Sequence, residues 1–207
     1  MKKARGQKAE RTREAKRALL HSALSIIGES GLAGLTLAEV GVRAGYSRGL
    51  VQYHYGSKDA LISALINWAV RGGQKMLRDH MTRGVESILL AIDAYNDARK
   101  NYPSNLRGFW VLSAEMGYSS NPDFHRQIVE YQKFLRKNFA EAFEEEGLSS
   151  AQAEPIAALV LAGMRGIIQE WIVEGDDLDV DQAFATLKDA ICDRVETLLQ
   201  EKVQKTN

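Results

Sequence analysis

Residue types that carry chemistry are scarce in this chain of 207 residues. Its single cysteine, Cys192, has no internal disulfide partner, which fits a reducing compartment and excludes a cysteine-rich metal site. A buried thiol is the simpler interpretation of Cys192, and redox sensing is the alternative. The four histidines are scattered, and no HExxH pattern, glycine-rich phosphate loop or nucleophile elbow is present. The sequence therefore predicts no metal site, no cofactor and no enzymatic activity.

Targeting signals are also missing. We expect no run to reach the length and apolarity of a membrane span, and the basic N-terminus lacks the apolar stretch and cleavage site of a signal peptide. With 45% hydrophobic and 26% charged residues, the chain can bury a full core as one large or two modest domains. These features predict a cytoplasmic globular protein.

The net charge of zero conceals an asymmetry between the two ends of the chain. Residues 1–58 hold 11 Lys and Arg against 4 Asp and Glu, a net charge of +7, whereas residues 59–207 hold 16 against 23, a net charge of −7. A basic module on an acidic body favours nucleic acid as a partner of the N-terminal part, and it predicts binding that depends strongly on salt.

Apolar residues recur at helical spacing along most of the chain, and no strand-like alternation or internal repeat is present. We expect an all-α protein of about nine helices, beginning near Thr12 after a flexible basic arm over residues 1–11. Lys2, Lys3, Arg5 and Lys8 of this arm are candidates for DNA contact, and a solubilising tail is the alternative.

Two short helices joined by a glycine-containing turn are predicted between residues 36 and 55. Thr36 and Glu39 form a capping box at the start of the first, and Ser47 is an N-cap for the second. Between them Gly45 can take the left-handed conformation that turns the chain sharply. This pattern is typical of a helix-turn-helix, whose second helix enters the major groove of DNA.

The stretch TLAEVGVRAGYSRGLVQYHYGSKDAL, residues 36–61, resembles the DNA-binding domain of the tetracycline-repressor (TetR/AcrR-type) family of bacterial regulators. The resemblance implies a DNA-binding domain over residues 1–58 and a helical effector-binding and dimerisation domain over residues 59–207. It also implies a homodimer that represses at a palindromic operator until a small-molecule effector releases it. Such a protein acts at the bacterial nucleoid when bound.

Candidate DNA contacts follow from this pattern. Arg48 and Gln52 are polar residues on the outer face of the second short helix; Arg pairs bidentately with guanine and Gln with adenine, and Gly49 between them leaves room for close approach. The resemblance implies that a further set of residues contacts DNA phosphates. For two of them, Tyr53 and His54, packing within the protein is the alternative. The set is Thr36, Ser47, Tyr53, His54 and Lys58.

Three glycines raise questions that the sequence leaves open. Gly41 stands where the family often has Ala, at a cost of about 1 kcal/mol within a helix, and reflects either close packing or a loosened helix. Gly72 and Gly73 lie within the next predicted helix, where they either weaken it or admit a neighbouring helix.

The family also often carries Tyr at the position where this chain has Gln52.

The C-terminal two-thirds offers candidates for an effector pocket, each of which has plain core packing as its alternative. Trp110, Tyr95, Trp171 and Glu115 would suit a cation, whereas Arg165 would suit a carboxylate or an internal Glu. The stretch FWVLSAEMGYSSNPDFH faintly resembles the choline-responsive repressors, and we infer no ligand from it. The candidate set is Tyr95, Phe109, Trp110, Met116, Phe124, Arg165 and Trp171.

The last two predicted helices, near residues 151–174 and from residue 180 onward, resemble the dimerisation pair of the family. The first is apolar nearly all round and the second repeats apolar residues at near-heptad spacing, although packing within one chain is the alternative. The expected interface consists of Ile156, Val160, Met164, Ile167, Phe184, Leu187, Ile191, Val195 and Leu198.

Two other function classes fit parts of the sequence: an effector-independent architectural DNA-binding protein and a helical protein–protein adaptor. The discrete pair Arg48 and Gln52 argues against the first, and the basic N-terminal module argues against the second.

Overall fold

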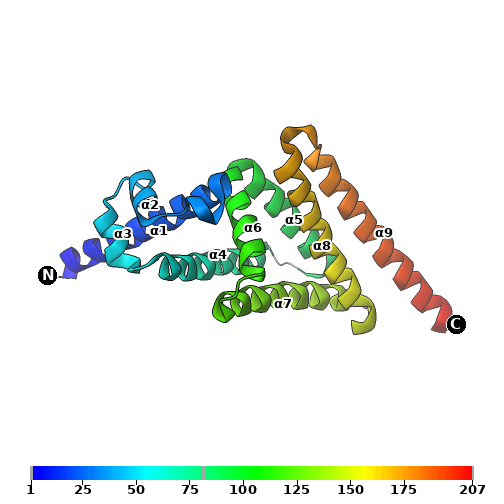
Figure 1. Cartoon of the computed structure of the whole chain (residues 1–207). Helices are drawn as coiled ribbons and strands as arrows, with labels where there is room; N and C mark the ends of the chain where they lie inside the picture. Colours follow the sequence, from blue (N-terminus) through cyan, green and yellow to red (C-terminus); the bar gives the residue numbers. More distant parts are fainter. Residues whose placement is uncertain (1, 81–82, 207) are drawn as a thin grey trace. The chain divides into compact units, whose positions relative to one another are not determined.

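The structure is a computed structural model that describes residues 2–80 and 83–206, without the side chains of residues 2–5, 8, 80, 176, 205 and 206. Over these residues the chain forms nine α-helices, one short 3-10 helix and no strand, so the all-α prediction is confirmed (Figure 1). The elements are α1 (Lys2–Gly34), α2 (Leu37–Arg43), α3 (Arg48–Tyr55), α4 (Lys58–His80), α5 (Gly84–Asn101), α6 (Pro103–Gly117), α7 (Pro122–Glu145), α8 (Ser150–Glu174), η1 (Gly175–Asp177) and α9 (Val180–Thr206).

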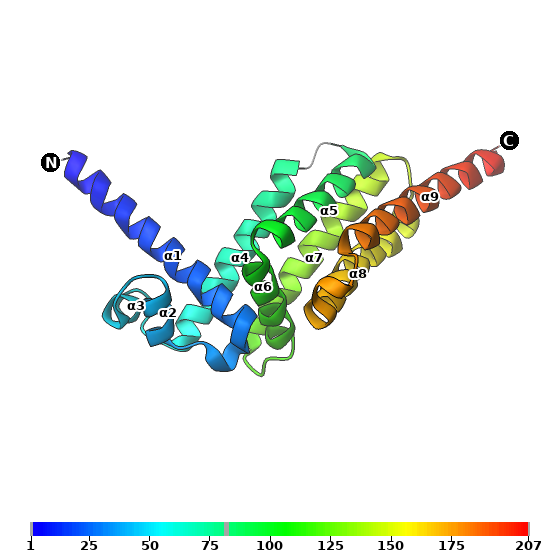
Figure 2. The ribbon, with the colours of Figure 1, turned by 90° about the horizontal axis from the view of Figure 1, so that it is seen from above.

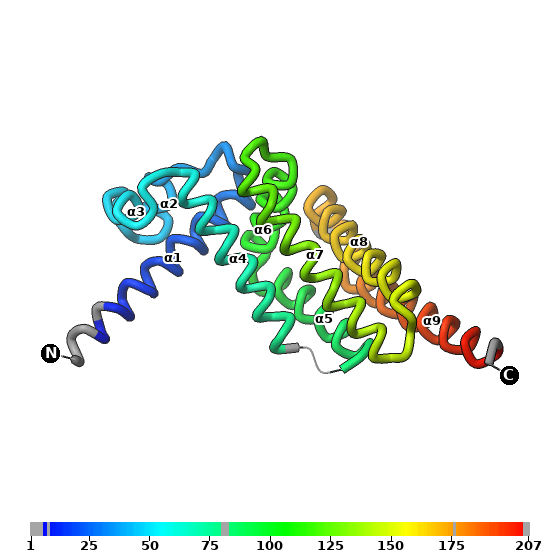
Figure 3. The backbone as a smooth tube through the Cα atoms, turned by 90° about the horizontal axis from the view of Figure 1, so that it is seen from below, coloured from blue at the N-terminus to red at the C-terminus, as the bar shows by residue number. Residues whose placement is uncertain are grey.

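The helices pack into two compact units. Unit 1 holds Met1–Gly72 and Tyr102–Ile128, and unit 2 holds Gly73–Asn101 and Val129–Asn207. The continuous helices α4 and α7 contribute residues to both, as the tube in Figure 3 lets the reader trace. By packing, α6 therefore belongs with the N-terminal helices, although the sequence placed it in the second domain. The functional division into residues 1–58 and 59–207 stays a prediction.

Helix α1 is longer at its N-terminus than the sequence predicted. We expected a flexible arm over residues 1–11, but the backbone is helical from Lys2. The physical reason is that Lys, Arg, Ala and Glu dominate this stretch, and these residues have high helix propensity even without an apolar face. Gly31 has φ +66° and marks a kink near the end of α1. The predicted contacts of Lys2, Lys3, Arg5 and Lys8 lie outside the described side chains.

The core of unit 1 forms around α1, whose Leu19, Ala23 and Ile27 are fully buried together with residues of α2, α3, α4, α6 and α7. Helices α1 and α6 lie backbone against backbone at Gly28 and Gly108. A Cβ atom on Gly108 would collide with the carbonyl oxygen of Leu24, and one on Gly28 would lie 2.9 Å from the backbone nitrogen of Gly108. Only glycine at both positions allows this backbone contact, so it fixes α6 against α1.

Unit 2 contains α8 beside α9, as Figures 1 and 2 show from two directions. By length and composition α8 is apolar enough to cross a membrane, so our expectation that no run would reach this level was wrong. Its row of buried residues, including Val160 and Ile168, shows a core helix of the unit. Helix α9 is also tied to α5, because Asp181 accepts hydrogen bonds from Asn96 and Arg99, and Lys188 donates to Asp93 at 2.6 Å.

The glycine pair within α4 has a packing explanation for one member. Helix α4 continues without interruption through both glycines. A Cβ atom on Gly73 would collide with the hydroxyl of Tyr131 from α7, whereas one on Gly72 would meet nothing within 4 Å. Of the two alternatives, close approach of another helix therefore applies at Gly73.

We predict that Gly108→Ala lowers the free energy of unfolding by about 1–3 kcal/mol or more, because the added methyl group must push α1 and α6 apart. Chemical denaturation followed by circular dichroism measures the change. The control is Gly72→Ala, which adds the same methyl group to a helix in open space and should stabilise by up to about 1 kcal/mol. Equal stabilities of the two variants would contradict the close contact.

Candidate nucleic-acid interface

The two short helices α2 and α3 begin at the predicted N-caps and are joined by the predicted turn. Of the predicted capping box, the structure shows the Thr36 half, whereas the Glu39 carboxylate lies 3.8 Å from Arg43. The Thr36 Oγ1 atom accepts a hydrogen bond from the Glu39 backbone N–H at 3.1 Å, and the Ser47 Oγ atom accepts from the Leu50 N–H at 3.2 Å. Gly45 in the turn has φ +75°, the left-handed region. These caps satisfy backbone donors at both helix starts and fix where α3 begins.

Gly41 allows the turn to lie close against α2. A Cβ atom there would lie 3.0 Å from the carbonyl oxygen of Tyr46 and 3.1 Å from the backbone nitrogen of Arg48. The Tyr46 N–H also donates to the Gly41 carbonyl at 2.8 Å. Close packing, rather than a loosened helix, accounts for glycine at this position.

The inner face of the pair anchors it to the core of unit 1 through Val40 and Val51, both fully buried. Leu50, which precedes Val51 in the sequence and is equally apolar, is only partly buried. The two positions are neighbours separated by about 100° around the helix axis, so the sequence pattern left the choice between them poorly determined.

The outer face of α3 exposes Arg48, Gly49 and Gln52 to solvent, as the base-reading hypothesis requires. The Gln52 Nε2 group donates to the carbonyl oxygen of Gly56, the residue that caps the end of α3. In this structure the Gln52 amide therefore supports the helix end, and its Oε1 atom is left as an acceptor.

The three consecutive rings after Gln52 have different surroundings. Tyr55 packs against the core and its pKa is raised by burial, so it anchors the helix. Tyr53 is 82% exposed. His54 lies between them, with ring centroids 5.2 Å from Tyr53 and 6.2 Å from Tyr55. Partial burial, and secondarily the charge of Lys16, lower the pKa of His54. One anchor thus suffices, and packing does not explain the exposed Tyr53.

Lys58 begins α4, where the helix dipole disfavours a cation. The Lys58 Nζ group donates to the carbonyl oxygen of Leu32 in the last turn of α1, at 2.6 Å. The family resemblance implies a phosphate as the partner of this cation, and the carbonyl oxygen near the end of α1 already compensates for its position in part. Lys58 keeps further N–H donors that a phosphate can accept.

An ion pair that the sequence did not predict ties α2 to α1. Arg43 donates to the Glu29 carboxylate at 2.5 Å, and this hydrogen bond is the main cause of a lowered Glu29 pKa. The two residues are 14 positions apart, and the sequence carries no local signal for such a pair. The two side chains are 34% and 44% exposed, and ion pairs that are open to solvent contribute little to stability. The pair therefore orients α2 more than it stabilises the fold.

The predicted effector residues fall into both units. Phe109, Trp110, Met116 and Phe124 belong to unit 1, and Met116 and Phe124 are part of its apolar core. Tyr95, Arg165 and Trp171 belong to unit 2.

Within unit 2 each predicted effector residue already has a protein neighbour. Tyr95 is buried against Phe184, and the Arg99 guanidinium lies 5.9 Å from the ring centroid of Trp171, where a bound cation was expected. Desolvation lowers the pKa of Arg165, which the phenols of Tyr95 and Tyr131 partly offset. The effector pocket stays a prediction.

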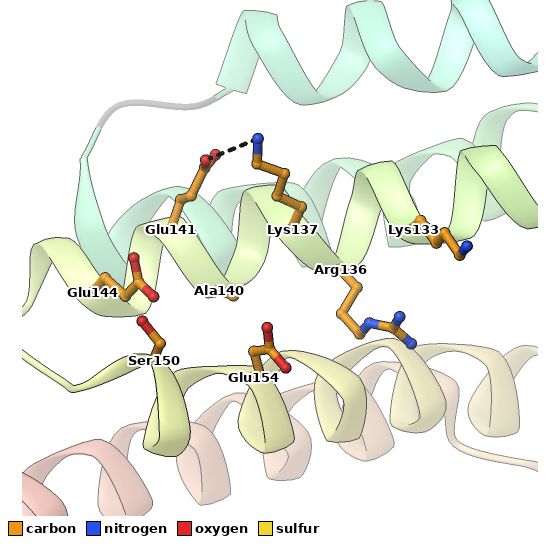
Figure 4. A pocket seen from close by; sticks show the side chains of 8 residues that line it. All are labelled: Lys133, Arg136, Lys137, Ala140, Glu141, Glu144, Ser150 and Glu154. Atoms are coloured by element: carbon orange, nitrogen blue, oxygen red, sulfur yellow. Dashed lines mark ion pairs between the residues drawn. The ribbon is translucent and has the colours of Figure 1, made fainter.

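A separate groove in unit 2, of about 430 Å³, lies between α7 and α8 (Figure 4). Cations cluster toward one end of its α7 wall and carboxylates toward the other, and Lys137 pairs with Glu141 at 3.6 Å. The predicted effector residues do not line it. Its walls are Lys133, Arg136, Lys137, Ala140, Glu141, Glu144, Ser150 and Glu154.

The predicted dimer residues are largely buried within one chain, which corrects their assignment as contact residues. Ile167 and Leu187 are only partly buried, whereas the remaining seven are at most 7% exposed: Ile156, Val160, Met164, Phe184, Ile191, Val195 and Leu198. A helix that is apolar all round has two apolar faces, and the spacing pattern selected the inner one.

The outer face of α8 carries the apolar residues that remain exposed. Leu159 and Val173 are 61% and 71% exposed, and Pro155, Ala162 and Gly166 are exposed at helical spacing along the same side. We call these five residues the α8 stripe.

Cys192 on α9 is partly buried. Burial, followed by the charges of Asp189, Glu196 and Asp193, raises the pKa of its thiol. Because the thiolate is the reactive form, a raised pKa favours the inert interpretation over redox sensing.

Comparison with known proteins agrees with this geometry. A family model described as "Bacterial regulatory proteins, tetR family" matches residues 19–65. The chain is 26% identical over 175 residues to the HTH-type transcriptional regulator BetI 1 of Chromohalobacter salexigens, covering 81% of this chain and 84% of that protein. It is 27% identical over 188 residues to BetI of Burkholderia mallei, covering 86% and 93%.

Solved structures share the fold. A TetR-family transcriptional regulator from Streptomyces coelicolor superposes with a TM-score of 0.72 at 17% identity, covering 90% of this chain and 96% of that one. A transcriptional regulator from Rhodococcus sp. Rha1 gives a TM-score of 0.70 at 21% identity with the same coverage.

We predict that Gly45→Ala lowers the free energy of unfolding by about 1–2 kcal/mol, because an L-residue with a Cβ atom is strained at φ +75°. Gly45→Asn should cost less, since Asn tolerates this conformation. Thermal denaturation of both variants, beside Gly49→Ala within the helix, provides the measurement. A Gly45→Ala protein as stable as Gly49→Ala would show that the turn does not require the left-handed conformation.

Proposed function

Because this chain is a TetR-type transcriptional regulator, we propose that it represses transcription as a homodimer on a palindromic operator and is released by a small-molecule effector. The observation that carries the proposal is the outer face of α3, where polar side chains are exposed to solvent. N-cap hydrogen bonds and buried valines hold this helix in place. Its relatives are transcriptional regulators, and we assign it no catalytic activity.

Base reading is assigned to Arg48, Gly49 and Gln52. With α3 in the major groove, the Arg48 guanidinium donates to O6 and N7 of a guanine, and Gly49 permits close approach of the helix. Bidentate pairing of Gln52 with adenine requires its amide to leave the Gly56 carbonyl. While that bond persists, Oε1 accepts from the amino group of an adenine or a cytosine.

Phosphate contacts position the helix without reading sequence. We assign this role to the exposed phenol of Tyr53, to the half-buried ring of His54 and to the Lys58 donors that the Leu32 carbonyl does not use. The hydroxyls of Thr36 and Ser47 sit at helix N-termini, where backbone N–H groups also favour an anion. The protein would act in the cytoplasm, at the nucleoid when bound.

Dimerisation is assigned to the α8 stripe rather than to the inner row. A second copy that covers Leu159 and Val173 would remove exposed apolar surface from water, and Ala162 and Gly166 between them permit close helix approach. Two linked copies of α3 then read two half-sites related by two-fold symmetry.

Effector release requires the ligand to bind the free and DNA-bound forms with different affinity. Phe109, Trp110 and Met116 lie on α6, which the glycine contact at Gly108 fixes against α1 of the DNA-binding helices. A ligand that pushes α6 toward α1 would therefore move α1, because the backbone contact leaves no space between the two helices.

We predict that Arg48→Ala weakens operator binding by about 1–3 kcal/mol and relaxes the preference at one base pair of each half-site. Fluorescence anisotropy on duplexes that carry each single base change measures both effects. The control is Lys58→Ala, which should weaken binding to operator and random DNA alike and flatten the salt dependence. Equal losses for Arg48→Ala on both DNAs would exclude base reading by this residue.

We predict that operator affinity rises as the pH falls from about 8 to 6. The pKa of His54 is lowered in the free protein, and a neighbouring phosphate raises it, so binding takes up a proton. Affinity measured across this range should show the rise in the unsubstituted protein and a smaller rise in His54→Gln. Identical pH dependence of the two proteins would contradict contact between His54 and DNA.

We predict that Leu159→Glu converts the dimer into monomers, because the interface would bury an unpaired carboxylate. Sedimentation equilibrium gives the mass directly. The control is Tyr118→Glu, which places the same charge at the C-cap residue of α6. Tyr118 is 93% exposed and lies outside the α8 stripe. A Leu159→Glu protein that stays dimeric would place the interface elsewhere.

A further inference from the structure

A groove of about 590 Å³ lies within unit 1 between the first turns of α1 and the exposed side of α3. We propose that this groove holds the sugar–phosphate backbone of one DNA strand and that Arg11 binds a phosphate there. The inference rests on the DNA binding proposed above and extends it to α1. The lining residues are Gln7, Arg11, Thr12, Ala15, Leu50, Tyr53 and His54.

The α1 wall changes character along one row of the helix. Residues spaced four apart share a face, and along this row Leu19 and Ala15 are buried whereas Arg11 and Gln7 are exposed. Figures 1 and 2 show these first turns of α1 running beyond α2 and α3. A helix face that packs against other parts of the protein would stay apolar along its length. The change to a cation, Arg11, and an amide, Gln7, is suited to binding a polyanion such as DNA.

The α3 wall offers hydrogen-bond donors to the same space. Tyr53 presents its phenol with the ring 82% exposed, and its edge-to-face contact with His54 holds the two rings together. The charge of Lys16 on α1 is felt at His54, where it adds to the lowering of the pKa. Lys16 thus places a positive charge near this wall, where it would attract a phosphate.

The floor of the groove suits a sugar rather than a second charged chain. Ala15 and Leu50 are the apolar residues of its lining, and they present no charge that the occupant would have to pair. Arg48 and Gln52 on the outer face of α3 enter the major groove, and the strand that borders that groove passes the adjacent side of the helix. Arg11 and Tyr53 then contact one strand from two elements.

The α1 wall lies outside the residues that the family model matches. That match begins at residue 19, and all four α1 residues of the groove precede it. Contact through Arg11 therefore does not follow from the family match.

The test compares Arg11→Ala with Arg13→Ala on an operator selected from random duplexes. Both variants remove one exposed arginine from the same helix, but Arg13 does not line the groove. Affinity is measured over a series of salt concentrations. Arg11→Ala should reduce the slope of log affinity against log salt by about 0.9 for each half-site phosphate lost, and Arg13→Ala should reduce it by much less. Arg11→Lys should restore most of the slope.

A second readout locates the phosphate. Ethylation of one phosphate per half-site should weaken binding of the unsubstituted protein and leave Arg11→Ala unaffected. Tyr53→Ala combined with Arg11→Ala should lose less affinity than the two separate losses together, because both contact one strand segment. Equal salt slopes for Arg11→Ala and Arg13→Ala would overturn the inference. Absence of DNA binding by the unsubstituted protein would instead overturn the proposed function.

Discussion

The backbone contact between Gly28 and Gly108 is the constraint on which the arrangement of unit 1 depends. Because neither residue has a side chain, α1 and α6 meet at a distance that any Cβ atom would prevent. Helix α1 in turn provides the buried row against which α2, α3 and the start of α4 pack. The orientation of α3, with its proposed DNA-reading surface, and the position of α6 therefore both depend on α1.

The proposed DNA-reading surface is possible because α3 has one face buried in the core and one face exposed to solvent. Val51 and Tyr55 hold the helix to the core, whereas Arg48, Gln52 and Tyr53 stay exposed. A helix of eight residues is too short to be stable alone, so the caps and the buried side chains together provide its rigidity. In the proposed complex, such rigidity would let a few polar groups discriminate between base pairs without a further cost of ordering.

Much of unit 1 was predictable from the sequence because local rules govern it. The caps at Thr36 and Ser47 and the left-handed Gly45 are signals confined to a few residues, and each was confirmed. The bond from Lys58 to the Leu32 carbonyl and the contact at Gly108 were not predictable. They join residues far apart in the chain, whose proximity depends on tertiary packing.

The C-terminal part shows the limit of periodicity more clearly. Helix α8 has apolar residues on all sides, so spacing alone did not separate the row that packs inside, such as Val160, from the exposed Leu159 next to it. The candidate effector residues met the same difficulty, because Met116 and Phe124 are of the residue types that line ligand pockets and yet belong to a core.

Selection of bound sequences from a random pool of DNA duplexes tests the central claim most directly. A sequence-specific dimeric regulator should enrich one site with two-fold symmetry and a guanine at equivalent positions of both halves. Binding without enrichment, or enrichment of a site without symmetry, would contradict it.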